Sequence, residues 1–291
     1  MSPALVAWCS VFLVVIVIAV LVVIKLTSSG GPTASSHQAI RPASSSLVRE
    51  LSTVPASVFN AIGAGIPSSF AGTAPIVISG QPPLTLDGKT PSMLYYGAEY
   101  CPFCAAERWS IAVALARFGT WTGLQTTASG LMDGDYSTLT FSKAQLKSPY
   151  VHFISIEACT NIVDPNVGGC DGYTHLQDPT QQEQEVLNKY ASSEFVPGNT
   201  QGINFPYIDV DNKVLYSGST YQPAVLTGLT QAEIAGSLTD PTNPFTRSII
   251  GTANYLTASV CAGTGGSPAA VCSSAGVKAA TSALQTSTPS G

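Results

Sequence analysis

Two cysteines separated by two residues, Cys101 and Cys104, constrain this chain more than any other feature of its sequence. The apolar residues 93–96 before the pair have a composition typical of a β-strand. Residues 105–118 after it are rich in helix formers, with apolar side chains at helical spacing. Pro102 suits the first turn of a helix, because its φ is already fixed and no N–H is needed there. The segment therefore predicts a strand, a turn, a dithiol and a helix.

This placement predicts different chemistry for the two sulfurs. Cys101 stands at the start of the predicted helix, where unpaired N–H groups and the helix dipole stabilise a thiolate. Cys104 lies one helical turn further on, close enough to close a disulfide with Cys101. Cys101 is therefore the candidate exposed nucleophile, and Cys104 is the candidate thiol that resolves a mixed disulfide. Tyr100 and Phe103 supply apolar surface around the sulfurs.

A Cys-x-x-Cys pair can also belong to a zinc site or form a purely structural disulfide. Zinc needs a second pair of ligands at compatible spacing. The sequence has no second Cys-x-x-Cys, and its three histidines, His37, His152 and His175, are scattered. Structural disulfides are seldom placed at a strand-to-helix junction with Pro inside the pair. The redox interpretation is favoured over both alternatives, and neither a metal nor a cofactor is expected.

The other five of the seven cysteines are Cys9, in an apolar N-terminal run, and two local pairs, Cys159/Cys170 and Cys261/Cys272. An even set of cysteines in loop-rich surroundings indicates an oxidising compartment. We expect both local pairs to be structural disulfides. Cys261 falls at the negative end of a predicted helix, and acidic residues flank Cys159 and Cys170, so thiolates are disfavoured there. A second redox pair at Cys159/Cys170, relaying electrons to the first, stays open as an alternative.

The N-terminus predicts a membrane anchor. The uncharged apolar run at residues 5–24 has the length of about 20 residues that a helix needs to cross a bilayer. It is too long for a typical signal peptide, and no clean cleavage site follows it. We expect residues 1–26 to be an uncleaved transmembrane anchor and the Ser/Gly/Ala/Pro-rich residues 27–46 to be a flexible stalk. Residues 273–291 are expected to be a disordered tail.

Two signals conflict on the orientation of this anchor. The basic residues Lys25, Arg41 and Arg49 follow it, which favours a cytoplasmic main domain. The paired cysteines and the low charged fraction, 10% against about 25% in typical soluble domains, favour the outside. A start codon upstream of Met1 would reconcile the two. We expect a single-pass protein of the cell membrane with an extracytoplasmic main domain. No nucleic-acid partner is expected, because the net charge is −5 and no run of Lys or Arg occurs.

The rest of the chain predicts further helices and strands. Strands are expected at residues 74–78, 123–128, 137–141 and 150–156, a strand end and turn at 84–89, and helices at 47–59, 181–191, 231–238 and 244–260. Phe205 and Pro206 stand just before a β-type run, and Asp211-Asn212 then predicts a hairpin turn. The residue pattern alone favours an ordinary trans bond at Pro206.

Two segments carry a resemblance to known families. Residues 95–109 read Tyr-Tyr-Gly-Ala-Glu-Tyr-Cys-Pro-Phe-Cys-Ala-Ala-Glu-Arg-Trp, and residues 114–119 continue Ala-Leu-Ala-Arg-Phe-Gly. This resembles an uncharacterised membrane-anchored family, domain of unknown function 929, over about residues 91–272. The order of predicted elements resembles the thioredoxin superfamily. The resemblance implies an α/β fold over residues 47–272, a thioredoxin-like central sheet flanked by helices, with a β-rich insert at 119–148.

The resemblance also implies roles for individual residues. Cys101 would be the nucleophile and Cys104 the resolving thiol. Pro206 would take the cis form beside the dithiol. Residues expected to contact substrate are Tyr100, Pro102, Phe103, Phe205 and Pro206.

One departure concerns the buried acid of the thioredoxin strand before the dithiol. Tyr95 and Tyr96 occupy that strand here, and neither Glu99 nor Glu107 matches the position of the acid. Proton transfer to Cys104 is therefore left without an assigned base.

The sequence thus predicts a membrane-anchored, extracytoplasmic thiol–disulfide oxidoreductase that uses a Cys-Pro-Phe-Cys dithiol. Its expected partners are protein thiols or disulfides, the membrane, and a redox partner within the membrane. The reduction potential sets whether it oxidises or reduces. The alternative is a non-catalytic partner-binding or scaffold module of thioredoxin fold at the cell surface. A Cys101 pKa near ~8.5 would favour the module, and a clearly lower pKa would favour the enzyme.

Overall fold

The computed structural model describes residues 39–164, 166, 169–200 and 202–286. The described residues belong to one compact unit. The predicted anchor, residues 1–26, lies outside the described residues, as does most of the predicted stalk. Within the described ranges, no helix combines the length and the apolar character that a membrane crossing requires.

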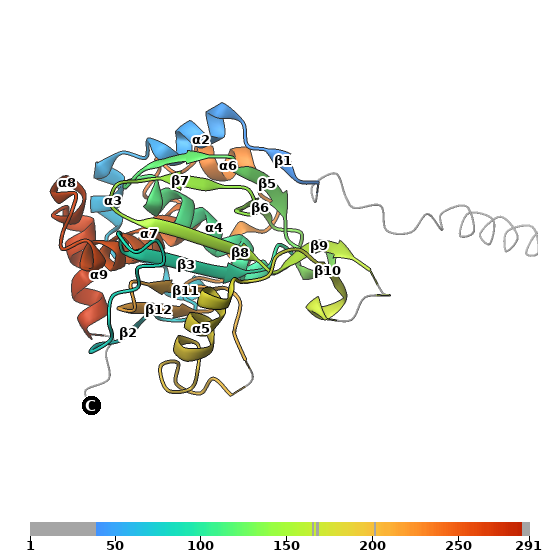
Figure 1. Ribbon diagram of the computed structural model, residues 1–291. Coiled ribbons are helices and arrows are strands. Elements are labelled where there is room, and N and C mark those ends of the chain that lie inside the picture. Colours follow the sequence, from blue (N-terminus) through green and yellow to red (C-terminus); the bar gives the residue numbers. More distant parts are fainter. Residues whose placement is uncertain (1–38, 165, 167–168, 201, 287–291) are drawn as a thin grey trace, which may run out of the picture. The chain divides into compact units, whose positions relative to one another are not determined.

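The described unit is built around a five-stranded sheet with the strand order β2-β12-β11-β3-β8 (Figure 1). The strands are Ile76–Val77 (β2), Ser92–Gly97 (β3), His152–Glu157 (β8), Tyr207–Val210 (β11) and Val214–Ser217 (β12). Strand β3 pairs in parallel with β8 and antiparallel with β11, so the sheet is mixed. In this register Gly97, at the end of β3, lies opposite Glu157, at the end of β8. The strand that leads into the dithiol, β3, is therefore hydrogen-bonded to a neighbouring strand on both sides.

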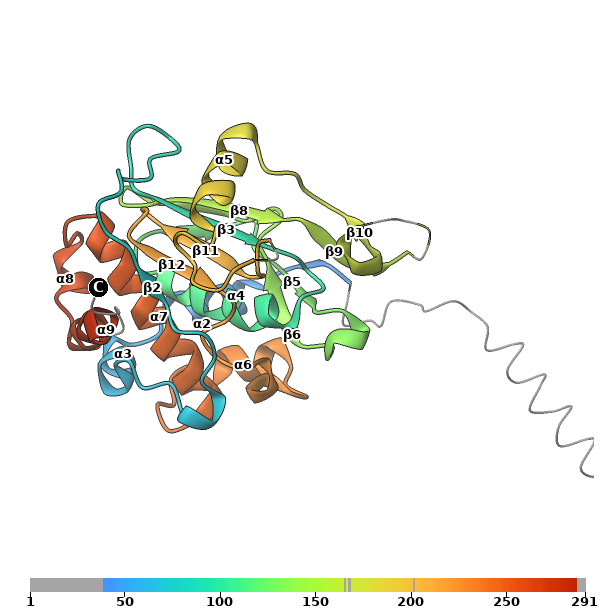
Figure 2. The same cartoon turned by 90° about the horizontal axis from the view of Figure 1, so that it is seen from below.

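Helices cover both faces of this sheet (Figure 2). Successive side chains of β3 point to opposite faces. Met93 and Tyr95 join the larger core beneath α4 (Pro102–Leu115) and α7 (Pro244–Gly263), and Leu94 joins a second core beneath α5 (Gln181–Tyr190). The helices are α2 (Ser45–Ser52), α3 (Ala56–Ile62), α4 (Pro102–Leu115), α5 (Gln181–Tyr190), α6 (Gln231–Gly236), α7 (Pro244–Gly263), α8 (Ala269–Cys272) and α9 (Ala275–Thr286). The helices predicted at 105–118, 181–191, 231–238 and 244–260 are confirmed within a few residues.

The segment after α4 forms two small antiparallel sheets. Strand β4 (Thr120–Thr122) pairs with β7 (Gln145–Lys147). Strand β5 (Gln125–Ala128) pairs with β6 (Ser137–Thr140) and with β1 (Arg41–Pro42). A short 3₁₀ turn, η2 (Leu131–Asp133), connects β5 to β6. The two β-type runs predicted in this part of the chain are confirmed as strands.

Both local cysteine pairs form disulfides. Cys159 bonds Cys170 across a hairpin of β9 (Cys159–Val163) and β10 (Tyr173–His175). The 3₁₀ turn η3 (Cys170–Gly172) precedes β10. Cys261, in α7, bonds Cys272, in α8. The predicted pairing is therefore present.

The N-terminal boundary of the folded unit requires a correction. The predicted stalk, residues 27–46, includes Arg41 and Pro42, which form β1, and the first turn of α2. The Ala43 N–H donates to the Leu124 carbonyl at 3.0 Å, and the Ser44 hydroxyl caps α2. The single helix predicted at 47–59 is two helices, because Pro55 cannot continue α2 and is instead the N-cap residue of α3.

The C-terminal boundary was also predicted wrongly. Residues 273–291 were expected to be disordered, but Ala275–Thr286 form α9. Val277, Ala280 and Leu284 recur at helical spacing and are buried. The large apolar residues are few among many Ser, Thr and Gly residues, so the composition of this segment indicates disorder although its apolar residues have helical spacing. The helix therefore belongs to the folded unit.

The predicted strand end at residues 84–86 is wrong as well, because no strand forms there. The Asp87 carboxylate accepts hydrogen bonds from the N–H groups of Lys89 and Thr90, which closes a turn instead. The Thr90 hydroxyl also donates to this carboxylate, and the three bonds together outweigh burial and lower the pKa of Asp87 to about 2. The remaining 3₁₀ turns are η1 (Ser68–Phe70) and η4 (Pro223–Leu226).

The packing of α9 predicts unequal effects for two Glu substitutions. Ala280→Glu should lower the free energy of unfolding by about 2 kcal/mol or more, because it buries an unpaired carboxylate. Ser282→Glu, on the exposed face of the same helix, should change it by less than about 0.5 kcal/mol. Urea denaturation followed by circular dichroism measures both. Equal effects would show that α9 does not pack on the core.

Candidate active site

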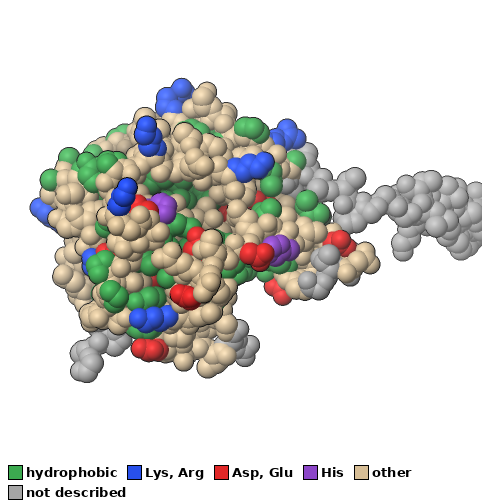
Figure 3. Space-filling model, viewed as in Figure 1, with side chains coloured by type: hydrophobic (Ala, Val, Ile, Leu, Met, Phe, Trp, Pro, Cys, Tyr) green, Lys and Arg blue, Asp and Glu red, His purple; other side chains and the backbone are tan. Residues whose placement is uncertain are grey.

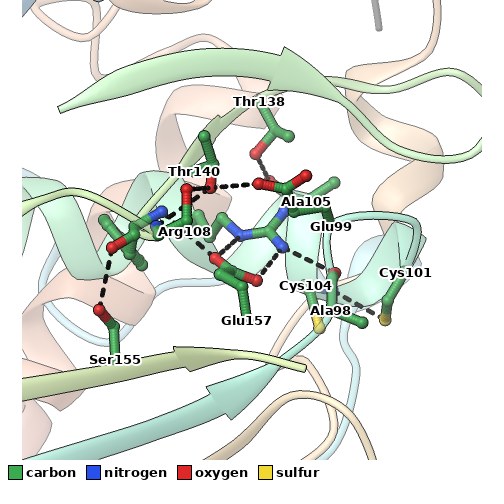
Figure 4. Close-up of polar contacts among 12 residues, drawn as sticks. Ala98, Glu99, Cys101, Cys104, Ala105, Arg108, Thr138, Thr140, Ser155 and Glu157 are labelled. Atoms are coloured by element: carbon green, nitrogen blue, oxygen red, sulfur yellow. Dashed lines mark hydrogen bonds and ion pairs between the residues drawn. The ribbon is translucent and has the colours of Figure 1, made fainter. Parts of the chain in front are cut away.

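The dithiol stands at the N-terminus of α4, as the sequence predicts. Cys101 is the N-cap residue with extended backbone, and Pro102 is the first helical residue. The Cys104 N–H donates to the Sγ of Cys101 at 3.3 Å (Figure 4). Both residues are free thiols in this structure. The helix N-terminus therefore directs a hydrogen-bond donor at the Cys101 sulfur.

The expectation of an exposed nucleophile is wrong for this conformation. Cys101 is only 5% exposed, and Cys104 is fully buried. Both pack in a small apolar cluster with Ala98, Ala158, Cys159 and Tyr173, and Tyr100, Tyr96, Cys170 and Phe205 lie against it. Cys159, Cys170 and Tyr173 of this cover belong to the β9–β10 hairpin, and no local sequence pattern predicts their contact with the dithiol. Phe103, in contrast, is 41% exposed.

A buried ion pair lies behind the dithiol. The Arg108 Nε donates to Glu157 Oε1 at 2.9 Å, and Nη2 donates to Oε2 at 2.6 Å (Figure 4). The same Nη2 donates to the Ala98 carbonyl at 2.7 Å. Both side chains are fully buried. Such a pair is tolerated in a core only when its geometry is good and both charges are matched, as they are here.

The environment shifts the pKa values of the two cysteines in opposite directions. Burial raises the pKa of Cys101, but hydrogen bonds from Cys104 and the positive charge of Arg108 outweigh it, so the pKa is lower than that of an ordinary thiol. Burial, followed by the hydrogen bond to Cys101 and the negative charge of its thiolate, raises the pKa of Cys104 well above the usual value. Cys101 therefore loses its proton more readily than Cys104 does.

Sequence reasoning missed Arg108 and Glu157. Arg108 belongs to the distinctive dithiol segment, but its partner is 49 residues away, and no local pattern joins the two. Glu157 ends β8 and meets the dithiol helix only through the parallel pairing of β8 with β3. The Tyr95 hydroxyl also donates to Glu157 Oε2, at 3.4 Å.

The two acids noted in the sequence bind elsewhere. Glu99 accepts a hydrogen bond from the Thr140 hydroxyl of β6 at 2.7 Å. Burial and the nearby Glu157 charge raise the pKa of Glu99 to about 7. Glu107 accepts from the Ser219 hydroxyl at 3.0 Å, and burial raises its pKa to about 7. Glu157 is therefore the acid that contacts Arg108 beside the dithiol.

Strand β6 of the insert fixes the dithiol helix from one side. The Thr138 hydroxyl donates to the Ala105 carbonyl in the first turn of α4 at 2.7 Å (Figure 4). The Trp109 indole N–H donates to the Ser137 carbonyl at 3.1 Å. These bonds hold the first two turns of α4, so the insert helps position the site.

The residues expected to contact substrate lie at or near the dithiol. Phe205 packs against the dithiol cluster and meets Tyr96 edge to face, with ring centroids 5.1 Å apart. The Phe205–Pro206 bond is cis, as the resemblance implied. Tyr100 stacks on Tyr173 with centroids 4.3 Å apart. A pocket of about 300 Å³ opens there and is lined by Tyr96, Tyr100, Ala158, Cys159, Cys170, Asp171, His175, Gln177, Asp178 and Phe205.

Within the described residues, no group of three or more His, Cys, Asp or Glu side chains is arranged to hold a metal ion. Basic side chains are scattered singly over the face shown in Figure 3.

The fold and the site together define a mixed α/β protein with a helix-capping dithiol. A family model described as "Domain of unknown function (DUF929)" matches residues 78–262, which include the dithiol, Glu157 and the Cys159–Cys170 pair. The chain belongs to this family. Neither the curated proteins nor the solved structures contained a match.

Gly97 provides a test of how tightly the site is packed. A Cβ at Gly97 would stand 2.3 Å from the Tyr95 Oη and 2.9 Å from the Cys104 Sγ. Gly97→Ala should therefore lower the free energy of unfolding by about 1–3 kcal/mol. Gly236→Ala is the matched control, because nothing lies within 4 Å of its Cβ position, and it should be neutral or slightly stabilising. Equal stability of the two variants would contradict this geometry.

Proposed function

We propose that the protein is a thiol–disulfide oxidoreductase with Cys101 and Cys104 as its redox pair. The observation that carries the proposal is the hydrogen bond from the Cys104 N–H to the Cys101 sulfur at the N-terminus of α4. Hydrogen-bond donors and a helix N-terminus stabilise a thiolate, which is the reactive form of cysteine. The positive charge of Arg108 acts in the same direction.

We also propose that the fold is thioredoxin-like. A strand, β3, leads into a dithiol and helix α4, and a parallel strand, β8, follows after the insert. A hairpin of β11 and β12, preceded by Phe205–Pro206, then adds on the other side of β3, and α7 follows. This is the order of elements that the sequence resemblance implies.

The proposed reaction transfers two electrons. The Cys101 thiolate attacks one sulfur of a substrate disulfide, forms a mixed disulfide and releases the other sulfur as a thiolate. Cys104 then loses its proton and attacks the Cys101 sulfur, which releases the second substrate thiolate. The substrate disulfide is reduced to two thiols and the Cys101/Cys104 pair is oxidised to a disulfide. The reverse sequence oxidises a substrate dithiol, and the reduction potentials set the direction.

Glu157 and Tyr95 are the proposed route for the Cys104 proton. The Tyr95 hydroxyl and the Cys104 sulfur face the same point of the Gly97 backbone, and the hydroxyl is hydrogen-bonded to Glu157. The carboxylate can therefore accept a proton through the hydroxyl when Cys104 attacks. Arg108 balances the carboxylate charge of Glu157 before this transfer and the thiolate charge of Cys104 after it.

Exposed apolar side chains around the dithiol support a polypeptide substrate. The apolar rim consists of Phe103, Leu131, Met132, Ile162 and Val163, each at least 40% exposed. The Gly130 N–H, next to Leu131, donates to the Tyr100 carbonyl at 2.8 Å, so η2 lies beside the residue that precedes Cys101. Val163 pairs with Tyr173, which stacks on Tyr100. Exposed apolar patches of this kind mark surfaces that bind other proteins.

The location of this activity is part of the proposal. Residues 5–24 would anchor the protein in the cell membrane, with the described unit outside the cytoplasm. The two disulfides in this unit support an oxidising compartment. Protein thiols or disulfides would be its substrates, and a membrane redox partner would regenerate the dithiol.

Insulin reduction with dithiothreitol tests the proposed function. Cys101→Ser and Cys104→Ser should each lower the rate above background by at least about a hundredfold, because each removes one step of the exchange. The Cys261→Ser/Cys272→Ser variant lacks the distant disulfide and should keep most of the activity. A wild-type protein without activity, or a Cys101→Ser variant with full activity, would contradict the proposal and favour a non-catalytic binding module.

A further inference from the structure

The Cys159–Cys170 disulfide shares the apolar cluster that holds the dithiol. Cys101, Cys104 and Cys159 are buried members of this cluster, and Cys170 packs against it. The other disulfide lies elsewhere, because Cys261 and Cys272 belong to the large core. Only one of the two disulfides is therefore close to the reactive thiolate.

Backbone contacts hold the dithiol loop against the hairpin that carries this disulfide. The Ala158 N–H donates to the Gly97 carbonyl at 2.7 Å, and the Glu99 N–H donates to the Cys159 carbonyl at 2.8 Å. Strands β3 and β8 thus continue their pairing past the sheet and place Cys159 beside the loop that leads to Cys101. The approach of the two segments is fixed by the main chain.

Side-chain contacts hold the Cys170 end of the disulfide close to the dithiol loop as well. Tyr100, which precedes Cys101, stacks on Tyr173 of β10. Its hydroxyl donates to the carboxylate of Asp171 at 2.7 Å, and Asp171 follows Cys170 directly. The residues next to Cys101 and Cys170 are therefore bound to each other. Both cysteines of the disulfide also line the 300 Å³ pocket, so the disulfide borders open space.

We propose that Cys159–Cys170 is a second redox-active pair, which exchanges electrons with Cys101/Cys104 inside the same chain. The proposal rests on the proposed function, since it needs a reactive Cys101. It replaces the sequence-based expectation that this disulfide is purely structural, and it leaves that expectation in place for Cys261–Cys272.

The exchange balances without any further reactant. The Cys101 thiolate bonds one sulfur of the Cys159–Cys170 disulfide, and the other sulfur leaves as a thiolate. Cys104 then loses its proton and bonds the Cys101 sulfur, and the second thiolate leaves. Cys101/Cys104 is oxidised by two electrons, and Cys159/Cys170 is reduced by two electrons to a dithiol. The reverse exchange passes electrons from the hairpin to the dithiol.

The first test measures how fast dithiothreitol opens each disulfide in the fully oxidised, full-length chain. Samples are quenched with acid, alkylated and analysed by peptide mass spectrometry. Cys101→Ser should slow the opening of Cys159–Cys170 by at least about tenfold, because an adjacent thiolate attacks at high effective concentration. Cys261–Cys272 is the internal control, since its cysteines are also 11 residues apart, and its opening should be unchanged. Equal rates for Cys159–Cys170 in wild type and variant would overturn the proposal.

A trapping experiment tests the mixed disulfide directly. The variants Cys104→Ser/Cys159→Ser and Cys104→Ser/Cys170→Ser each leave Cys101 with one thiol of the hairpin. Mild oxidation should form a bond from Cys101 to that thiol in at least one of them. The control Cys104→Ser/Cys261→Ser leaves Cys101 with Cys272 and should form no such bond. Absence of the bond in both hairpin variants, or equal yield in the control, would overturn the proposal.

The two proposals fail in distinguishable ways. Ser is a good N-cap residue, so Cys101→Ser should keep the start of α4 intact. If this variant loses insulin reduction but opens Cys159–Cys170 at the wild-type rate, the relay is wrong and the proposed function stands. If it keeps insulin reduction, the proposed function is wrong.

Discussion

The rest of the site depends on the buried ion pair between Arg108 and Glu157. Removing two charges from water costs several kcal/mol per ion, and only close, matched contacts offset this cost. Here the pair joins α4 to the end of β8, and a third bond from Arg108 reaches the Ala98 carbonyl in the dithiol loop. One side chain therefore links the helix, the sheet and the loop that carry the cysteines. It also brings a positive charge close to both sulfurs.

This arrangement makes two chemically identical side chains behave differently. The Cys101 sulfur accepts a hydrogen bond from the Cys104 N–H at the N-terminus of α4, whereas the Cys104 sulfur is enclosed by Gly97, Tyr95 and the core. The difference comes from position in the fold, since no Lys or Arg stands within three residues of either cysteine in the sequence. The hairpin of β9 and β10 covers both sulfurs and brings a disulfide into the same cluster. The element that covers the dithiol therefore also carries the proposed second redox pair.

Local features of the site could be predicted from the sequence, and distant partners could not. The Cys-Pro-Phe-Cys segment predicts the strand, the helix and the N-cap position of Cys101, because each follows from neighbouring residues. No local sequence pattern indicates that Glu157 pairs with Arg108. The hairpin of β9 and β10 covers the two sulfurs only because β8, which precedes it, pairs with β3. Both ends of the unit were misjudged for a related reason. Polar, Gly-rich and Ser-rich composition gave no signal for the short strand β1 at Arg41–Pro42, and it obscured the few buried residues, such as Val277, that pack α9 on the core.

The central claim is that the fold activates Cys101 as a thiolate. The pH dependence of iodoacetamide alkylation of reduced Cys101, measured by mass spectrometry, tests it most directly. The thiolate fraction rises through the pKa, so a lowered pKa should give a midpoint clearly below the ~8.5 of a free cysteine. The midpoint should rise in the Arg108→Gln/Glu157→Gln variant, which removes the cation and keeps hydrogen-bonding side chains. A wild-type midpoint at or above ~8.5 would contradict the claim.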